Sequence, residues 1–174
     1  MKSPPRVYLA GFDVFLPDAE RVFGRLRAEA ERWGLQALVP TDNGLEVGRD
    51  GSPAVVAAKI RDANLAMLRQ ADAVVANLAP FRGLEPDAGT VYEVGFAQAL
   101  GLPVCAYGLS AVCYAERVSG AIDCRRDGAG MLRESVSGLL VEDFGLPVNL
   151  MLACGVLTAS DGVEALAVIA RRVG

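Results

Sequence analysis

The sequence predicts an α/β fold in which helices flank a mostly parallel sheet. Short apolar runs of strand length alternate with helical segments of ten or more residues, a pattern typical of βαβ units. The 174 residues match the usual size of one domain, so we expect a single domain over residues 1–174. Hydrophobic residues make up 52% of the chain and charged residues 22%, which is ordinary for a protein with a packed core.

In the first part of the chain, residues 6–10 form an apolar run that ends at a glycine, which predicts a strand. Asp18 can cap a helix that runs to Trp33, because apolar side chains recur on one face of that segment. Residues 35–39 are predicted to form a short buried strand. The polar stretch 40–52 is predicted to be a loop.

In the middle of the chain, Ser52 can cap a long helix that runs to residue 70, with a proline at its first position. Residues 73–78 and 103–107 are predicted strands, because both are short, apolar and bounded by turn residues. Between them, residues 90–100 are predicted to form a helix that a glycine ends. The uncharged stretch that includes this helix is interrupted by glycine and proline, which favours a buried helix–strand unit over a membrane span.

The last part of the chain is less regular. Residues 108–141 mix glycine, serine and charged side chains, and we expect them to form a flap over the active site. Residues 146–155 are predicted to form a short apolar helix, and residues 161–173 a final amphipathic helix.

The composition excludes several kinds of chemistry. The chain has no histidine, which rules out Ser-His-Asp and Cys-His catalysis and histidine-ligated zinc. The net charge of −4, with only two lysines, disfavours nucleic acid and anionic membranes as partners. The four cysteines form no C-x-x-C motif, and the N-terminus has no signal-peptide pattern. We therefore expect a cytoplasmic protein with buried thiols, although a disulfide among them stays open.

Carboxylates gather where the carboxyl ends of parallel strands would meet, which is where ligands bind in such sheets. Without histidine, a pair of carboxylates is the natural set for acid–base and nucleophilic work, as in glycoside cleavage. The candidates that follow predicted strands are Asp13, Asp42, Glu85, Asp87 and Glu93. Asp72 comes just before the third predicted strand, and Asp143 precedes the last apolar segment.

Glu93 is the strongest candidate for a nucleophile. It lies in the first turn of the helix predicted to begin near Thr90, where backbone N–H groups would keep it ionised. The same residues also fit a capping box, which needs no function. Structural alternatives stay open as well for Asp72 and Asp87, as turn residues, and for Tyr8, as a core aromatic.

Several segments together resemble one known family, the nucleoside 2-deoxyribosyltransferases. They are VYLAG at residues 7–11 with FLPD at 15–18, ADAVVANL at 71–78, DAGTVYEVGFA at 87–97, GLPV at 101–104 and DFGLPVNLML at 143–152. The segment from Asp87 to Glu93, joined to GLPVNLM at this separation, is the most specific of these signals. The resemblance covers most of the chain and is weakest over residues 108–140.

The resemblance implies a flavodoxin-like (Rossmann-like), doubly wound sheet of about five parallel strands with helices on both faces. It also implies a homo-oligomer, dimer-based or hexameric, that acts in nucleoside salvage. Its substrates would be 2′-deoxynucleosides and free nucleobases, and neither a metal nor another cofactor is expected.

The resemblance also implies roles for individual residues. Glu93 would attack C1′ of a 2′-deoxynucleoside and form a covalent deoxyribosyl-enzyme, from which a second base takes the sugar. Asp72 would donate and accept a proton near the base, and Tyr8 would orient Glu93. Asp87 and Asn149 would hold the sugar hydroxyls, with Asn149 supplied by a neighbouring subunit. The remaining candidates for substrate contact, by their positions in loops, are Gly11, Phe12, Asp13 and Asp42.

Two other functions fit the same residues. An N-glycosidase that hydrolyses deoxynucleosides or nucleoside 5′-monophosphates would use a similar glutamate. Such enzymes usually place Ser, Gly and Arg in the first loop for the phosphate, whereas residues 12–15 are FDVF here, which favours an uncharged 5′-hydroxyl. A flavodoxin-like binding module would keep the fold and use the carboxylates only as helix caps.

Overall fold

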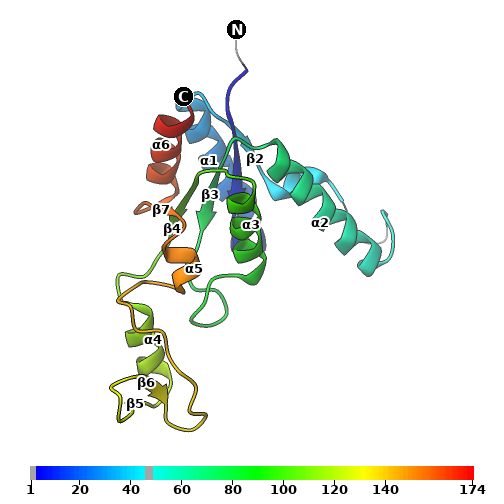
Figure 1. The fold of residues 1–174 in the computed structure, drawn as a ribbon. Coiled ribbons are helices and arrows are strands. Elements are labelled where there is room, and N and C mark those ends of the chain that lie inside the picture. Colours follow the sequence, from blue (N-terminus) through cyan, green and yellow to red (C-terminus); the bar gives the residue numbers. More distant parts are fainter. Residues whose placement is uncertain (1–2, 46–48) are drawn as a thin grey trace.

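The computed structural model describes residues 3–45 and 49–174, and its centre is a five-stranded sheet (Figure 1). The strands are β1 (Arg6–Ala10), β2 (Gln36–Leu38), β3 (Ala73–Asn77), β4 (Val104–Tyr107) and β7 (Leu157–Thr158). Their order is β2-β1-β3-β4-β7, and every neighbouring pair is parallel. This arrangement confirms the flavodoxin-like prediction. The fifth strand, β7, comes from a segment for which the sequence predicted none.

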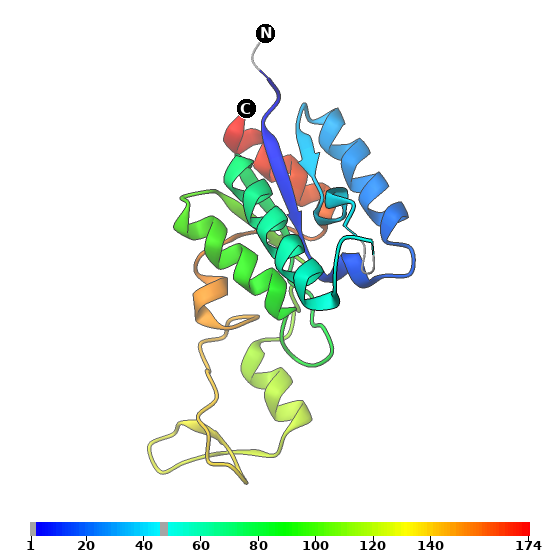
Figure 2. The same ribbon diagram turned by 90° about the vertical axis from the view of Figure 1, so that its right-hand side faces the viewer.

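Four helices cover the two faces of the sheet (Figure 2). They are α1 (Ala19–Arg32), α2 (Pro53–Gln70), α3 (Ala88–Ala99) and α6 (Gly162–Val173). Alternate residues of β1 point to opposite faces, so Val7 and Leu9 pack with α1 and α6, and Tyr8 and Ala10 pack with α2 and α3. Both faces are thereby buried, as expected for a parallel sheet.

The elements at the carboxyl ends of the strands are short. The 3₁₀ turns η1 (Phe12–Phe15) and η2 (Pro40–Asn43) follow β1 and β2. The helix predicted over residues 146–155 is only α5 (Leu150–Ala153), which packs against α3. Of the predicted loop 40–52, residues 46–48 lie outside the described part of the chain. No described helix is both long and apolar enough to cross a membrane.

The start of α3 differs from the capping-box prediction. The helix begins at Ala88, and the Asp87 side chain caps it by accepting a hydrogen bond from the Thr90 backbone N–H at 2.9 Å. Thr90 therefore lies inside the helix and Glu93 lies in its second turn. Both the capping box and the placement of Glu93 beside the free N–H groups of the first turn are wrong. Asp18 and Ser52 hold the N-cap positions of α1 and α2 as predicted, but neither side chain makes a capping hydrogen bond.

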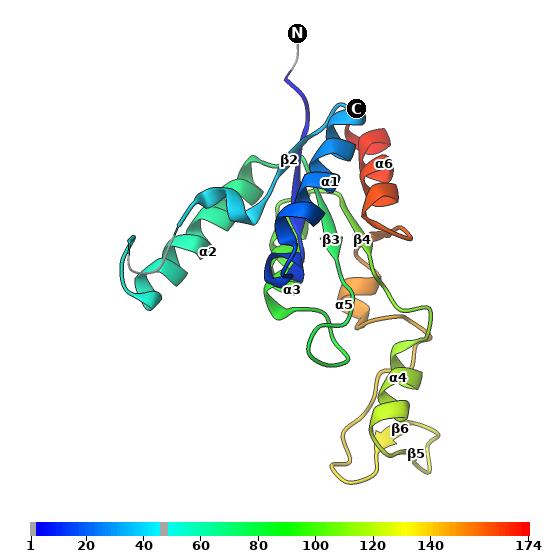
Figure 3. The same cartoon turned by 180° about the vertical axis from the view of Figure 1, so that it is seen from behind.

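Residues 109–145 form a projection that we call the arm. Figures 1 and 3 show it extending away from the sheet, between β4 and α5. It contains α4 (Tyr114–Ala121) and an antiparallel pair, β5 (Cys124–Arg126) with β6 (Leu132–Glu134). Its buried apolar side chains are few: Ala115, Val118 and Val141.

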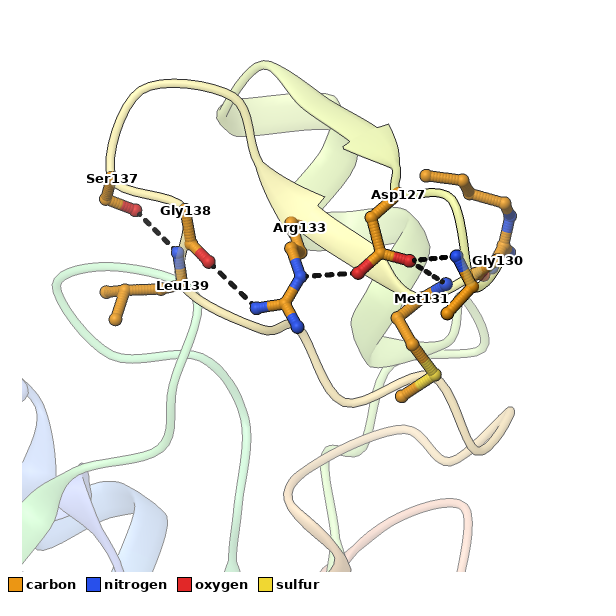
Figure 4. A network of polar contacts seen from close by, with 9 residues as sticks. Asp127, Gly130, Met131, Arg133, Ser137, Gly138 and Leu139 are labelled. Atoms are coloured by element: carbon orange, nitrogen blue, oxygen red, sulfur yellow. Dashed lines mark hydrogen bonds and ion pairs between the residues drawn. The ribbon is translucent and has the colours of Figure 1, made fainter.

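Polar contacts hold the outer part of the arm together (Figure 4). The Asp127 carboxylate accepts hydrogen bonds from Arg133 Nε at 2.7 Å and from the Met131 backbone N–H at 3.0 Å. Arg133 Nη1 also donates to the Gly138 carbonyl at 3.0 Å. These hydrogen bonds hold the pKa of Asp127 below its usual range, with the bond from Arg133 as the largest cause. The hairpin is thus organised by charge-assisted hydrogen bonds more than by apolar burial.

A glycine replacement tests how closely the arm joins the sheet. Gly108 has a φ of 76°, and an added Cβ would lie 2.7 Å from Asn77 Oδ1 and 2.9 Å from Ala79 Cβ. We expect Gly108→Ala to destabilise the protein by about 2–4 kcal/mol, because overlap adds to the cost of a positive φ. Gly101→Ala is the matched control, since its φ of 75° is similar and nothing lies within 4 Å of the added Cβ. Chemical unfolding of both variants measures the difference, and equal losses would contradict the close approach.

Candidate active site

A cavity of about 550 Å³ lies at the carboxyl edge of the sheet, beside β1, α2 and the start of α3. Its polar and aromatic lining comes from Phe15, Thr41, Asn64, Asp87, Thr90 and Glu93. This volume suits a ligand of nucleoside size. A larger and more open hollow of about 840 Å³, between α3, α5 and α6, has no carboxylate among its lining residues. The smaller cavity is therefore the candidate active site.

The Glu93 carboxylate is held at one of its two oxygens. The Tyr8 hydroxyl donates a hydrogen bond to Glu93 Oε1 at 2.6 Å, and Asn64 Nδ2 donates to the same atom at 3.4 Å. Tyr8 lies in β1 and is fully buried, and Asn64 lies on α2. No donor among the described residues contacts Glu93 Oε2. That oxygen is the one left to react with a ligand in the cavity.

Burial controls the ionisation of this pair. Burial raises the pKa of Glu93 above its ordinary value of 4.5, the hydrogen bonds from Tyr8 and Asn64 lower it, and the charge of Asp87 raises it, with a net rise. Burial and the neighbouring Glu93 carboxylate raise the pKa of Tyr8 far above its usual range. Tyr8 therefore stays protonated and donates its hydrogen bond throughout the physiological range. A raised pKa also makes the Glu93 carboxylate more nucleophilic than an exposed one.

Asp87 joins Glu93 in the same cavity. Its Oδ2 accepts hydrogen bonds from the Thr90 backbone N–H and the Thr90 hydroxyl, at 2.9 Å and 3.0 Å. Its Oδ1 accepts none from the described residues. The capping role thus fixes the side chain and leaves one carboxylate oxygen to accept a hydrogen bond from a ligand hydroxyl.

Aromatic rings form one wall beside these carboxylates. The Phe12 and Phe15 rings both stack on Phe81, with centroid distances of 5.1 Å and 5.5 Å. The Arg82 guanidinium lies 4.6 Å from the Phe81 ring centroid. Phe15 is the ring that lines the cavity, and 60% of its surface is exposed. It offers a flat apolar surface on which a planar ligand can stack.

Three predicted acidic site residues lie elsewhere. Asp72 precedes β3, at the amino edge of the sheet, where it is exposed and accepts a hydrogen bond from the Arg6 backbone N–H at 2.7 Å. Asp13 is 5% exposed, and both of its oxygens accept hydrogen bonds from Asn77 Nδ2. Asp42 forms an ion pair with Arg27. None of the three lines the Glu93 cavity, so the role near the base expected for Asp72 does not match its position.

Of the remaining predicted site residues, one lines the Glu93 cavity and the others do not. Gly11 lines the cavity, and an added Cβ there would lie 2.9 Å from Asn77 Cβ, so the backbone passes close to β3. Phe12 stacks on Phe81 without lining the cavity itself. Asn149 caps α5 and donates a hydrogen bond to Glu142 Oε1 at 2.6 Å, outside the Glu93 cavity of its own chain. No residue of the arm lines that cavity, so the flap expected over residues 108–141 does not cover this site within one chain.

Asn64 is a site residue that the sequence did not predict. Its Oδ1 is buried without a hydrogen-bond partner, while its amide nitrogen contacts Glu93. A signal was available, since Asn64 precedes the buried Leu68 by one helical turn and so lies on the core-facing side of α2. An asparagine on that side of a helix needs a polar partner.

Comparisons with known proteins find relatives that are similar in sequence and fold. A family model described as nucleoside 2-deoxyribosyltransferase matches residues 7–151. A 2-deoxyribosyltransferase structure from Leishmania mexicana is 32% identical, with a TM-score of 0.76, over 97% of this chain and 98% of that one. A 2-deoxyribosyltransferase from Bacillus psychrosaccharolyticus, 17% identical with a TM-score of 0.58 over 91% of this chain and 88% of that one, shares the fold. An uncharacterized protein of Schizosaccharomyces pombe is 30% identical over 93% of this chain and 81% of its own length.

The raised pKa of Glu93 predicts a cost in stability. A carboxyl group whose folded-state pKa is raised stabilises the fold fully below its ordinary pKa, and that contribution is lost as the pH rises through the folded value. We expect Glu93→Gln to be more stable than the wild type at pH 7, by about 1 kcal/mol. The gain in stability of Glu93→Gln should fall to zero at pH values below 4.5, the ordinary pKa of a glutamate side chain.

Urea unfolding between pH 3.5 and pH ~8 measures this difference. Glu31→Gln, at an exposed position on α1, is the control and should show no such dependence. A Glu93→Gln variant that is equally or less stable at pH 7 would contradict the buried charge.

Proposed function

The chain belongs to the nucleoside 2-deoxyribosyltransferase family, and we propose that it transfers 2-deoxyribose between nucleobases through a covalent intermediate on Glu93. The family and the Leishmania structure support deoxyribosyltransferase or related N-glycosidase chemistry. The single observation that carries the finer proposal is the state of Glu93. One carboxylate oxygen is held by Tyr8 and Asn64, and no described residue donates to the other oxygen, in a cavity of nucleoside size.

In the first half of the reaction, Glu93 Oε2 bonds to C1′ as the bond between C1′ and the base nitrogen breaks. The bonding electrons leave with the base, and positive charge develops on the sugar. Deoxyribose lacks an electron-withdrawing 2′-hydroxyl, so this state is easier to reach than with ribose. Tyr8 and Asn64 remain on Oε1, which becomes the carbonyl oxygen of the ester.

In the second half, a nitrogen of the incoming base bonds to C1′ and the bond to Glu93 Oε2 breaks. Negative charge returns to the carboxylate, where the hydrogen bond from Tyr8 stabilises it. Two displacements at C1′ retain the configuration. The leaving base needs a proton, and Asn64 cannot supply one, because a carboxamide does not titrate. Among the described lining residues only Asp87 and Glu93 are acids, and Glu93 must be ionised to attack. The proton for the leaving base therefore comes from Asp87 or from water, and the N–H proton of the incoming base returns to that group.

The rest of the cavity suits an uncharged nucleoside. Asp87 Oδ1 would accept a hydrogen bond from a sugar hydroxyl, and Phe15 would stack on the base. None of the described lining residues is basic and two are acidic, which disfavours a 5′-phosphate. A second subunit would have to bring its Asn149 to this cavity for that residue to hold the sugar.

Hydrolysis is the alternative outcome of the same chemistry. Water can attack the deoxyribosyl-enzyme at C1′ in place of a base, which gives free sugar. The exclusion of water from the cavity therefore decides between transfer and hydrolysis.

Base exchange tests the proposal directly. We expect the protein with 2′-deoxyinosine and free adenine to form 2′-deoxyadenosine, separated by chromatography, and Glu93→Ala to form none. The denatured wild type incubated with donor alone should show an added deoxyribosyl mass. Release of hypoxanthine at a rate indifferent to adenine would instead indicate a hydrolase. A thymidine donor serves as the second substrate if the pocket accepts only pyrimidines.

Asn64 provides a test based on pH. Asn64→Asp would place a second carboxylate beside Glu93, which raises the pKa of Glu93 and removes a donor. Since Glu93 must be ionised to attack C1′, we expect the acid limb of the kcat/KM profile to move up by about one pH unit. Asn64→Ala, which adds no charge, is the control and should lower the rate with a smaller shift. An unchanged acid limb in Asn64→Asp would remove Asn64 from the site.

A further inference from the structure

We propose that Arg117 of the arm is a positioning residue that joins two segments, one of which leads into the active site. The segments are the loop between β3 and α3, residues 78–87, and the stretch of residues 146–149 before α5. This inference rests on the proposed function, because its kinetic consequences concern substrate binding. The contacts themselves do not depend on it.

The Arg117 guanidinium bridges these segments directly. Its Nη1 donates a hydrogen bond to the Leu84 carbonyl oxygen, and its Nη2 donates to the Pro147 carbonyl oxygen at 2.6 Å. Leu84 lies three residues before Asp87, and Pro147 lies two residues before Asn149. One side chain of α4 therefore joins two segments that are far apart in the sequence.

A neighbouring residue of α4 supports both attachments. The Tyr114 backbone N–H donates to the Leu146 carbonyl at 2.7 Å. Burial and the neighbouring Glu85 carboxylate raise the pKa of Tyr114 to about 12. The Arg117 guanidinium lies 5.8 Å from the Tyr114 ring centroid. Leu84 also packs against the buried apolar cluster of the arm. The same helix thus touches each segment twice.

The chemistry of this contact calls for an arginine. Two carbonyl oxygens on separate segments need a planar fork of donors, which the compact lysine ammonium does not provide. Among the described residues no carboxylate forms an ion pair with Arg117, and its Nε is buried without a hydrogen-bond partner. A side chain needed only for packing would not bring an uncompensated charge into this position. The carbonyl bridge accounts for the charge.

The bridge affects the site through the loop that it holds. Residues 78–87 carry Phe81, which backs the aromatic wall, and Asp87, which lines the Glu93 cavity. The nucleophile and its two donors lie on α3, β1 and α2, and Arg117 contacts none of them. Release of the loop should therefore weaken substrate binding on the side of Phe81. The hydrogen bond from Thr90 keeps Asp87 in place, so the ionisation of Glu93 should not change.

The kinetic test uses variants at two arginines of the arm. We expect Arg117→Met to raise KM about tenfold with less than about a threefold fall in kcat and an unchanged pH profile. Arg117→Lys should fall between this variant and the wild type. Arg125→Met, at an exposed position on β5, is the matched control and should behave as the wild type. An active wild type with the same KM in Arg117→Met would overturn the proposal.

Amide hydrogen exchange tests the bridge without any substrate. In Arg117→Met, exchange should accelerate in residues 79–87 and 146–149, and in Arg125→Met it should not. If the wild type transfers no sugar at all, the proposed function fails, and the exchange result alone decides on the bridge. If Arg117→Met does not fold, Arg117→Lys and Tyr114→Phe are measured. Wild-type exchange and KM in both of these variants would overturn the proposal.

Discussion

The hydrogen bond from Tyr8 to Glu93 is the interaction on which the site depends. It joins the middle of β1 to α3 at 2.6 Å, and it requires Tyr8 to point to the sheet face that α2 and α3 cover. Because Tyr8 is fully buried, the Glu93 carboxylate that accepts its hydrogen bond is largely buried too, and burial raises the pKa of Glu93. Burial of Glu93 thus makes the carboxylate more nucleophilic and also lowers the stability of the fold. The second donor, Asn64, contacts the same oxygen, and no donor in the described part of the chain reaches the other one.

Strand order explains which carboxylates join Glu93. The sheet runs β2-β1-β3-β4-β7, so the chain reverses direction across the sheet between β1 and β3, and a crevice opens at the carboxyl edge there. Asp87 follows β3 and reaches that edge, whereas Asp72 precedes the same strand and lies at the opposite edge. Asp13 also follows a strand, but Asn77 holds it away from the cavity. Whether a residue precedes or follows its strand therefore decides which edge of the sheet it reaches.

The arm shows a different kind of organisation. Its core is small, and its hairpin depends on the polar contacts around Asp127 and Arg133 (Figure 4). Its attachment to the sheet layer passes through Arg117 and Tyr114, which hold main-chain carbonyls of two neighbouring segments. A projection of this kind positions loops from outside the main core, so loop geometry can change without any change in the nucleophile.

The sequence by itself determined the α/β class, most of the strands and helices, and Glu93 with Tyr8 and Asp87 as candidates. The spacing of apolar residues along a strand or helix is a local property that the sequence shows directly. The same holds for a motif such as DAGTVYEVG, whose residues are close together in the chain. Only the tertiary structure decided that Thr90 lies inside α3, that Asp72 and Asp42 lie outside the cavity, and that Asn64 contacts Glu93. These outcomes depend on which face and which edge of the sheet each side chain reaches. Strand order and long-range packing set that geometry, and no local pattern records them.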